Sequence, residues 1–359
     1  MRPASIEEAQ QAVAQLAGAR KRLLIVGGGT QLGLGGPAQF DERLETAGLN
    51  RIVEYAPSDQ VVTVEAGVTL AALQKELAGN GQRLSLDPPL PERATLGGII
   101  AANSFGPLRT RFGSVRDLII GVSIVRADGA RAKGGGKVVK TVAGFDLPKL
   151  MCGSLGTLGL IVTATFRVHP IPVARATLIA HGVRTADVFP LVRAIRTAQL
   201  EPAAMLATRR THGSWDVTVR FEGFEAGVTQ QREKLRALAP VEPAEWPQEA
   251  PSGALRLKVA ALPTELEKVE AALPFAQSLS WLPTLGIGFA GAGAGALNAA
   301  DTAGALEAAR RSIQVVVESA PFPLDPWGPP TAALRLHKSV KARFDPDNLL
   351  APGRFVGGI

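Results

Sequence analysis

Short apolar runs separated by turn residues dominate the first 170 residues of the chain. They predict four strands, at residues 23–26, 61–65, 118–126 and 160–168. Two helical stretches accompany these strands. One spans residues 5–16, where Ser5 and Glu8 fit a capping box, and the other spans residues 70–77 and follows Thr69. This mixture of strands and helices is typical of an α+β domain.

The pattern changes at Pro170-Ile171-Pro172, because two prolines interrupt any strand that ends at Val168. Between about residues 172 and 325, helical stretches alternate with β-like ones. The predicted helices span residues 186–200, 228–238, 264–272 and 302–312, and the predicted strands span residues 215–221, 255–259 and 313–318. A last helix is expected at residues 332–342. The sequence therefore predicts an α+β fold with a second domain after about residue 170.

A glycine-rich loop, Gly27-Gly28-Gly29-Thr30-Gln31-Leu32-Gly33, directly follows the apolar run 23–26. A strand that ends in three glycines leaves backbone N–H groups bare, and no side chain blocks a close ligand, which suits a phosphate. Glycine triplets also form plain turns, so this loop alone does not decide the matter. A Rossmann-type dinucleotide fold is disfavoured, because residues 34–45 carry glycine and proline where its crossover helix would run.

Composition restricts the chemistry that the chain can perform. Apolar residues make up 46% of the 359 residues, so a substantial core can be buried. Cys152 is the only cysteine, which excludes an internal disulfide and an iron–sulfur cluster with cysteine ligands from this chain. The four histidines are scattered without the spacing of a metal site, and no metal is expected. Redox chemistry would therefore require a bound organic cofactor.

The charge pattern limits the possible partners. The formal net charge is +7, but the basic residues are spread along the chain and only one tyrosine is present, so no nucleic-acid partner is expected. An anionic cofactor or an acidic partner surface explains the basic balance equally well. No apolar segment approaches the roughly 18 residues of a membrane span, and the N-terminal residues lack an apolar targeting segment. We therefore expect a cytoplasmic protein without a membrane span.

Four groups of segments, in the same order along nearly the whole chain, carry a resemblance to a known family. They are residues 27–30; residues 94–103 with 106–109 and 113–117; residues 135–147, which lead into 153–161; and residues 344–346 with 351–354. The chain resembles the FAD-binding flavoproteins of the vanillyl-alcohol-oxidase / p-cresol-methylhydroxylase (PCMH) type. Within that superfamily it is similar to the FAD-binding E subunits of glycolate oxidase, and the run 135–147 is the segment that resembles this branch.

The resemblance implies a domain organisation. A two-lobed PCMH-type FAD-binding domain is expected at residues 1–170, with lobes at about 1–55 and 56–170 and the pyrophosphate between them. A smaller α+β cap domain is expected at residues 171–330. The remaining residues, 331–359, would form a C-terminal helix and tail that pack on the FAD-binding domain.

The resemblance also implies non-covalent FAD, because residues 1–151 contain no histidine or cysteine that could form the covalent flavin link found in many relatives. The implied cofactor-binding residues are Gly27, Gly28, Gly29, Thr30, Gln31, Gly33, Thr95, Gly97, Gly98, Asn103, Ser104, Gly106, Gly156, Gly159, Ile161 and Arg354. Less specific interpretations stay open for some of them: Gly97-Gly98 also suits an ordinary helix start, and Arg354 also suits a tail anchor. A Gly28→Val change is expected to push a side chain into the pyrophosphate space.

The function implied is that of the FAD-binding subunit of a glycolate (D-2-hydroxy-acid) oxidase or dehydrogenase. Its partners would be a larger catalytic FAD subunit and an iron–sulfur subunit, and its flavin would accept or relay electrons from a small 2-hydroxy-acid substrate. Such a complex could be peripheral to the inner membrane through another subunit. No catalytic base is assigned from the sequence. Two alternatives stay open: a self-sufficient FAD-dependent oxidoreductase of a hydroxy acid or alcohol, and a non-catalytic assembly subunit.

Overall fold

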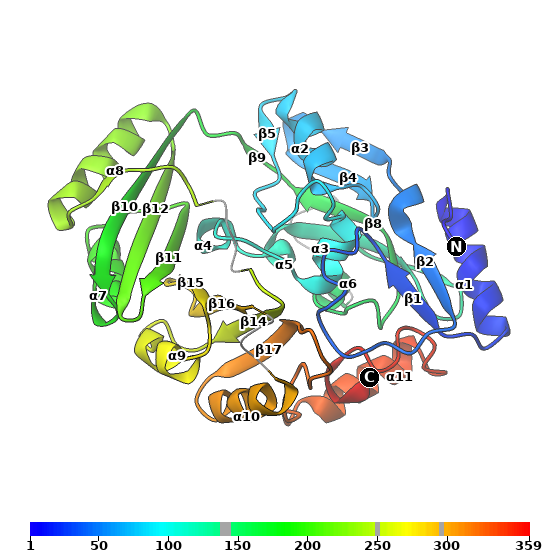
Figure 1. Ribbon diagram of the computed structural model, residues 1–359. Helices are drawn as coiled ribbons and strands as arrows, with labels where there is room; N and C mark the ends of the chain where they lie inside the picture. Colours follow the sequence, from blue (N-terminus) through cyan, green and yellow to red (C-terminus); the bar gives the residue numbers. More distant parts are fainter. Residues whose placement is uncertain (137–144, 248–251, 294–297) are drawn as a thin grey trace. The chain divides into compact units, whose positions relative to one another are not determined.

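The computed structural model describes residues 1–136, 145–247, 252–293 and 298–359 (Figure 1). The chain divides into two compact units. Unit 1 comprises Met1–Gly106, Gly113–Ile171 and Pro329–Ile359, and unit 2 comprises Pro107–Phe112 and Pro172–Gly328. Helices and strands are mixed in both units, so the predicted α+β class is confirmed. None of the helices in the described parts of the chain is long and apolar enough to cross a membrane.

Unit 1 contains one five-stranded sheet and two pairs of short strands. The five-stranded sheet is antiparallel with the order β3-β4-β8-β6-β7, whereas β1 and β2 pair in parallel and β5 pairs with β9. The strands are β1 (Leu23–Val26), β2 (Glu42–Glu45), β3 (Ile52–Ala56), β4 (Val61–Glu65), β5 (Gln82–Arg83), β6 (Ile119–Val125), β7 (Arg131–Gly135), β8 (Leu160–Arg167) and β9 (His169–Pro170). The four strands predicted in this half correspond to β1, β4, β6 and β8. The five missed strands are short or partly exposed, so they lack a clear apolar pattern.

Helices flank these strands in unit 1. They are α1 (Ile6–Gly18), α2 (Leu70–Ala78), α3 (Leu96–Ala102), α5 (Val115–Leu118), α6 (Leu147–Met151) and α11 (Leu334–Phe344). The start of α1 follows the prediction, since the Ser5 hydroxyl accepts a hydrogen bond from the Glu8 N–H at 3.1 Å. The Glu8 carboxylate accepts from the Ala4 N–H at 2.8 Å, one residue before the partner that a standard capping box would use.

The largest core of unit 1 lies against the five-stranded sheet. It joins inward residues of β4, β6 and β8 to α2, α3, α5 and α6, and it includes the fully buried Phe166 and Leu96. Val340 and Phe344 of α11 pack against this same cluster. Packing on this core is the reason why the C-terminal segment, although distant in sequence, belongs to unit 1.

Unit 2 is built on an eight-stranded antiparallel sheet that contains two similar halves. In each half the elements follow the order β-α-β-β-α-β, and the sheet order β13-β10-β12-β11-β15-β16-β14-β17 joins the halves through β11 and β15. The first half is β10 (Ala174–Arg184), α7 (Thr185–Thr197), β11 (Ala204–Thr211), β12 (Ser214–Gly223), α8 (Glu225–Leu238) and β13 (Glu242–Pro243). The second half is β14 (Leu255–Ala260), α9 (Leu266–Ala272), β15 (Ser278–Leu282), β16 (Ile287–Ala292), α10 (Ala299–Arg310) and β17 (Gln314–Ser319).

Alternation along the strands decides which sheet face is covered. Trp215, Val217, Val219 and Phe221 of β12 are fully or almost fully buried and share one core with residues of α7, α8, α9 and α10. The four helices therefore cover one face of this sheet. The short helix α4 (Arg109–Phe112) also belongs to unit 2, where the preceding Leu108 packs with Ala203, Ala204 and Trp246.

Candidate functional site

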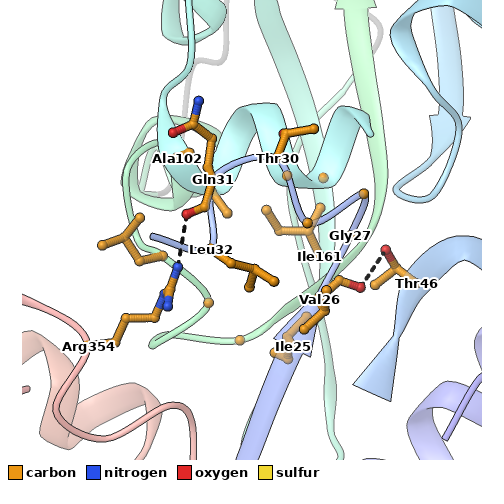
Figure 2. Close-up of a pocket in the computed structure, with 18 residues that line it drawn as sticks. Ile25, Val26, Gly27, Thr30, Gln31, Leu32, Thr46, Ala102, Ile161 and Arg354 are labelled. Atoms are coloured by element: carbon orange, nitrogen blue, oxygen red, sulfur yellow. Dashed lines mark hydrogen bonds between the residues drawn. The ribbon is translucent and has the colours of Figure 1, made fainter. Parts of the chain in front are cut away.

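A pocket in unit 1 is formed where three glycine-rich segments meet. These segments are the loop that leaves β1, the helix α3, and the turn that precedes and enters β8; Figure 2 shows them converging, with Thr46 and Arg354 at the sides. The lining residues are Ile25, Val26, Gly27, Gly28, Gly29, Thr30, Gln31, Leu32, Thr46, Gly97, Gly98, Ala101, Ala102, Leu155, Gly156, Gly159, Ile161 and Arg354.

Thr95 holds the first segment against the second. It is the N-cap of α3, and its hydroxyl oxygen accepts hydrogen bonds at 3.3 Å from the N–H of Gly98 in its own helix and from the N–H of Gly28 in the loop. The side chain is buried behind the pocket wall, with 3% of the residue exposed. One hydroxyl thus fixes both the start of the helix and the position of the loop.

Glycine is required at several wall positions because backbone segments approach each other closely. A Cβ at Gly28 would overlap the carbonyl oxygen of Arg93, and one at Gly27 would overlap the hydroxyl of Thr95. At Gly97 a Cβ would lie 2.8 Å from the Cβ of Ala66. The expectation that valine at position 28 enters the phosphate space is therefore wrong: its Cβ would point into the backbone at residue 93.

The other side of the loop presents hydrogen-bond donors. Within the described residues, the backbone N–H groups of Gly29, Thr30 and Gln31 have no hydrogen-bond acceptor. Gly29 has φ +72°, a left-handed conformation that glycine adopts without strain and that aims successive N–H groups into one concavity. At Gly98 an added Cβ would lie 3.1 Å from the Thr95 hydroxyl, and no other described atom outside its own helix lies within 4 Å, so this wall is open except on the side of Thr95. Such a cradle suits an anionic group lying against the backbone.

Arg354 supplies a positive charge at the same wall. Its Nη2 donates a hydrogen bond to the carbonyl oxygen of Gln31 at 3.1 Å, and only 7% of the residue is exposed (Figure 2). Burial lowers the pKa of this guanidinium from its usual range. A positive charge at the wall complements a negatively charged ligand.

The third segment is anchored to the end of α3. The N–H of Gly153 donates to the carbonyl oxygen of Ile100 at 2.9 Å, and the N–H of Leu155 donates to that of Ala101 at 2.8 Å. Beside these contacts, the buried Oδ1 of Asn103 and Oγ of Ser154 have no hydrogen-bond partner among the described residues. Unpartnered buried oxygens next to a pocket are expected where a polar ligand completes the network.

The structure brings eleven of the sixteen sequence-predicted residues into the pocket wall: Gly27, Gly28, Gly29, Thr30, Gln31, Gly97, Gly98, Gly156, Gly159, Ile161 and Arg354. The other five lie outside the wall. Thr95 sits behind it, Asn103 and Ser104 follow α3, Gly33 is exposed, and a Cβ at Gly106 would overlap Asp87. Ser154, Thr46 and Leu155 were missed because ordinary residue types in a turn carry no sequence signal.

The segment that resembled the E-subunit branch is only partly covered. Residues 137–144 of it lie outside the described residues. Asp146, at its end, pairs with Lys149 at 2.7 Å and serves as the N-cap of α6.

Groups for covalent or metal chemistry are absent from the pocket wall as described. None of the lining residues is a histidine or a cysteine. Burial raises the pKa of the Cys152 thiol to about 12, and its Sγ donates a hydrogen bond to the Pro148 carbonyl oxygen, so it stays protonated. In the described ranges no group of three or more His, Cys, Asp or Glu side chains is placed to hold a metal ion.

Comparison with known proteins identifies the cofactor of the chain. Residues 1–134 match the family model of the FAD binding domain. The chain carries an FAD binding domain. Its cofactor is FAD. Thirteen of the eighteen pocket residues lie in the matched range, namely those from Ile25 to Leu32 together with Thr46, Gly97, Gly98, Ala101 and Ala102.

Curated relatives are FAD-linked oxidoreductases and their subunits. The chain is 33% identical over 233 residues to glycolate oxidase subunit GlcE of Escherichia coli (strain K12), which is 65% of this chain and 63% of that relative. It is 33% identical over 157 residues to glycolate oxidase subunit GlcD of Bacillus subtilis (strain 168), covering 44% of this chain and 33% of the relative. It is 33% identical over 202 residues to D-2-hydroxyglutarate dehydrogenase of Xanthomonas citri pv. viticola, covering 55% of this chain and 42% of the relative. The matches thus span less than two thirds of these relatives.

Solved structures confirm the fold. The solved structure of alkyldihydroxyacetonephosphate synthase superposes with a TM-score of 0.72 over 99% of this chain and 77% of its own, at 15% sequence identity. At this identity the likeness concerns the fold alone. The family match and the relatives confirm the resemblance to FAD-binding oxidoreductases that the motifs indicated.

Proposed function

We propose that this chain is the FAD-binding subunit of a multi-subunit oxidase or dehydrogenase that acts on glycolate or a related D-2-hydroxy acid. The observation that carries the proposal is the unit 1 pocket, where three unpartnered N–H groups and the buried Arg354 meet in an FAD binding domain. These groups fit the pyrophosphate of FAD, the most negatively charged part of the cofactor.

Different residues around the pocket would bind different parts of the cofactor. The N–H groups of residues 29–31 would donate to phosphate oxygens, and the Arg354 guanidinium would neutralise their charge. Asn103 and Ser154 would offer their unpartnered oxygens to the polar parts of the cofactor between phosphate and ring. Bound FAD supplies a two-electron acceptor for oxidation of an alcohol carbon. Attachment would be non-covalent, because neither a histidine nor a cysteine is among the residues that line the described wall.

The substrate class and the partners come from the relatives. Those that the chain matches are named for glycolate, D-2-hydroxyglutarate and D-lactate, which share a hydroxyl group next to a carboxylate. Two of them are named as subunits of glycolate oxidase. A larger catalytic FAD subunit and an iron–sulfur subunit are therefore the expected partners. The iron–sulfur centre would have to be in a partner, since this chain has a single cysteine. The cytoplasmic location and any peripheral attachment to the inner membrane stay predictions.

An absorption spectrum of the purified chain, recorded before and after anaerobic addition of glycolate, tests the proposal. We expect a flavin spectrum that trichloroacetic acid releases into the supernatant, little bleaching by glycolate with the isolated chain, and bleaching after reconstitution with the partner subunits. A chain that takes up no FAD even after reconstitution with the free cofactor would leave only an assembly role.

A self-sufficient oxidoreductase is the second candidate, because relatives such as D-lactate dehydrogenase of Anaerostipes hadrus are named as dehydrogenases rather than as subunits. The same spectra separate the two. Bleaching of the isolated chain by glycolate, D-lactate or D-2-hydroxyglutarate would establish that it oxidises substrate by itself. Failure of the whole panel would exclude this candidate for these substrates.

A further inference from the structure

A buried ion pair between Lys341 and Asp345 contacts a turn of the pocket wall, although neither residue lines the pocket. The Lys341 ammonium of α11 is 6% exposed and donates three hydrogen bonds: to the Asp345 carboxylate at 2.6 Å, to the Leu350 carbonyl oxygen at 2.8 Å and to the Thr157 carbonyl oxygen at 2.9 Å. An ammonium has three N–H donors, so its hydrogen-bonding capacity is fully used. Burial lowers the pKa of Lys341, and the contact with Asp345 opposes this shift.

Asp345 completes the arrangement from the other side. It is 1% exposed and accepts the N–H of Leu349 at 2.9 Å and the N–H of Leu350 at 2.7 Å in addition to the ammonium. A buried pair of this kind adds little net stability compared with apolar residues of the same volume, but it tolerates only one geometry. We call Lys341, Asp345 and the four backbone groups that they bind at residues 157, 349 and 350 the tail knot.

The tail knot joins segments that form the pocket wall. Thr157 belongs to the turn in which Gly156 and Gly159 line the pocket. On the tail side, the Leu349 carbonyl oxygen accepts from the Leu23 N–H at 2.7 Å, and the Ala351 N–H donates to the Leu23 carbonyl oxygen at 2.9 Å. The knot therefore attaches the tail beside β1, the strand that leads into the glycine loop.

Arg354 follows this attachment by three residues. The Gly36 N–H donates to the Arg354 carbonyl oxygen at 2.8 Å, and the Arg354 guanidinium reaches Gln31 in the loop. The place of that guanidinium at the pocket wall thus depends on where the knot holds residues 349–351. Lys341 and Asp345 themselves do not line the pocket.

We infer that Lys341 and Asp345 are positioning residues for the cofactor, and that the tail knot couples closure of the C-terminal tail to retention of FAD. The inference rests on the proposed FAD pocket. With the knot formed, Arg354 and the turn at residues 156–159 are held at the wall before the cofactor arrives, so FAD does not have to order them. By linkage, bound FAD must stabilise the closed tail to the same extent.

The test measures the FAD dissociation constant of the apoprotein in Lys341→Met, Arg354→Met and the double variant. Lys338→Met is the matched control, since it makes the same change on the exposed face of α11. We expect Lys341→Met to weaken FAD binding about tenfold, and the control to leave it unchanged. If Lys341 acts through Arg354, its effect should largely disappear in the Arg354→Met background. Additive effects would mean that the knot does not act through Arg354, and an unchanged dissociation constant in Lys341→Met would overturn the inference.

Hydrogen exchange of residues 345–359 provides a second readout. FAD should slow exchange in this tail in the unchanged protein and much less in Lys341→Met. If Lys341→Met fails to fold, Lys341→Arg keeps the buried charge but cannot direct three bonds from one nitrogen to the three acceptors. An Arg variant that folds and binds FAD with unchanged affinity would overturn the inference. An unchanged protein that binds no FAD would instead overturn the proposed function.

Discussion

The glycine-rich pocket of unit 1 and the eight-stranded sheet of unit 2 represent two different uses of the chain. The pocket is built from turns, with three backbone segments so close together that added Cβ atoms at Gly27 and Gly28 would overlap their neighbours. The sheet is built from regular alternation, with Trp215, Val217, Val219 and Phe221 filling one face. Buried apolar side chains therefore hold the sheet against its helices, whereas glycines, which lack a side chain, let the backbone segments of the pocket approach each other.

Because of this difference, a change in side-chain volume should affect different properties in the two regions: stability in the sheet and cofactor binding in the pocket. In the sheet, removing side-chain volume from the core should lower the stability of the fold and leave the affinity for the cofactor unchanged. In the pocket, adding volume costs cofactor binding, and the effect on stability depends on whether the new atom meets backbone or open space.

The largest effect is expected for Gly28→Val. Its Cβ would overlap the Arg93 carbonyl oxygen, and this backbone contact cannot yield without moving the loop away from Thr95. We expect loss of bound flavin together with a clear fall in the unfolding temperature of the apoprotein. Absorption at the flavin band and thermal unfolding followed by circular dichroism measure the two effects. Normal flavin content at normal stability would show that the loop packs differently.

Trp215→Ala tests the sheet. The indole is fully buried and its Nε1 donates to the Thr185 hydroxyl at 3.1 Å, so the cavity should cost about 3–5 kcal/mol of unfolding free energy. Trp215→Phe keeps most of the ring volume and should lose much less. Urea unfolding gives both values. FAD affinity, measured where the variant is still folded, should stay the same; a parallel loss of affinity would mean that the two regions are not independent.

Gly98→Ala is the sharpest test of the open wall. Its Cβ meets only the Thr95 hydroxyl, at 3.1 Å, and alanine favours a helix over glycine by about 1 kcal/mol. The Thr95 hydroxyl must shift by a few tenths of an ångström, which offsets this gain, so the apoprotein should keep about its original stability. FAD binding should weaken about tenfold, because the methyl would enter the proposed cofactor space.

Gly304→Ala provides the control for this change. Gly304 lies in α10 with no atom within 4 Å of an added Cβ, so the variant should gain stability without any change in FAD affinity. Equal behaviour of the two alanine variants would place the cofactor elsewhere.

The smallest effect is expected at the edge of the unit 2 sheet. A hydrogen bond to Asp216 at 3.0 Å, with a further one to Glu242 at 3.1 Å on the edge strand β13, raises the pKa of His181. A raised folded-state pKa stabilises the fold fully below the unfolded value of about 6.5, and this contribution disappears as the pH rises through the folded-state pKa.

The unfolding temperature should therefore drop slightly more in the unchanged protein than in His181→Gln as the pH rises from about 6 to about 8. Asp216 also pairs with Arg210, at 3.3 Å, so part of the edge network should persist in the variant. Because the imidazole is largely exposed, the difference should be small and should decrease with added salt. Identical pH profiles would show that His181 does not hold β13.

Much of the regular structure was predictable because its cause is local. The apolar runs at β1, β4, β6 and β8 and the periodic stretches at α7, α8, α9 and α10 record which side faces a core, and the predictions for these elements are confirmed within a few residues. Strands such as β10 and β15 were missed, since their polar and apolar residues do not alternate clearly enough to be recognised without their sheet neighbours.

The sequence by itself determined the α+β class, because turn residues and periodicity are local properties of the chain. The domain boundary near residue 170 and the cofactor-binding role of the glycine segments stay predictions. Only the tertiary structure decided that Thr95 lies behind the wall, that a Cβ at Gly28 points at Arg93, and that Asn103 and Ser154 carry unpartnered oxygens. It also decided that Lys341 supports a turn 184 residues away. These relations join segments that are far apart in sequence, and no local pattern specifies which backbone a side chain will meet when the chain closes on itself.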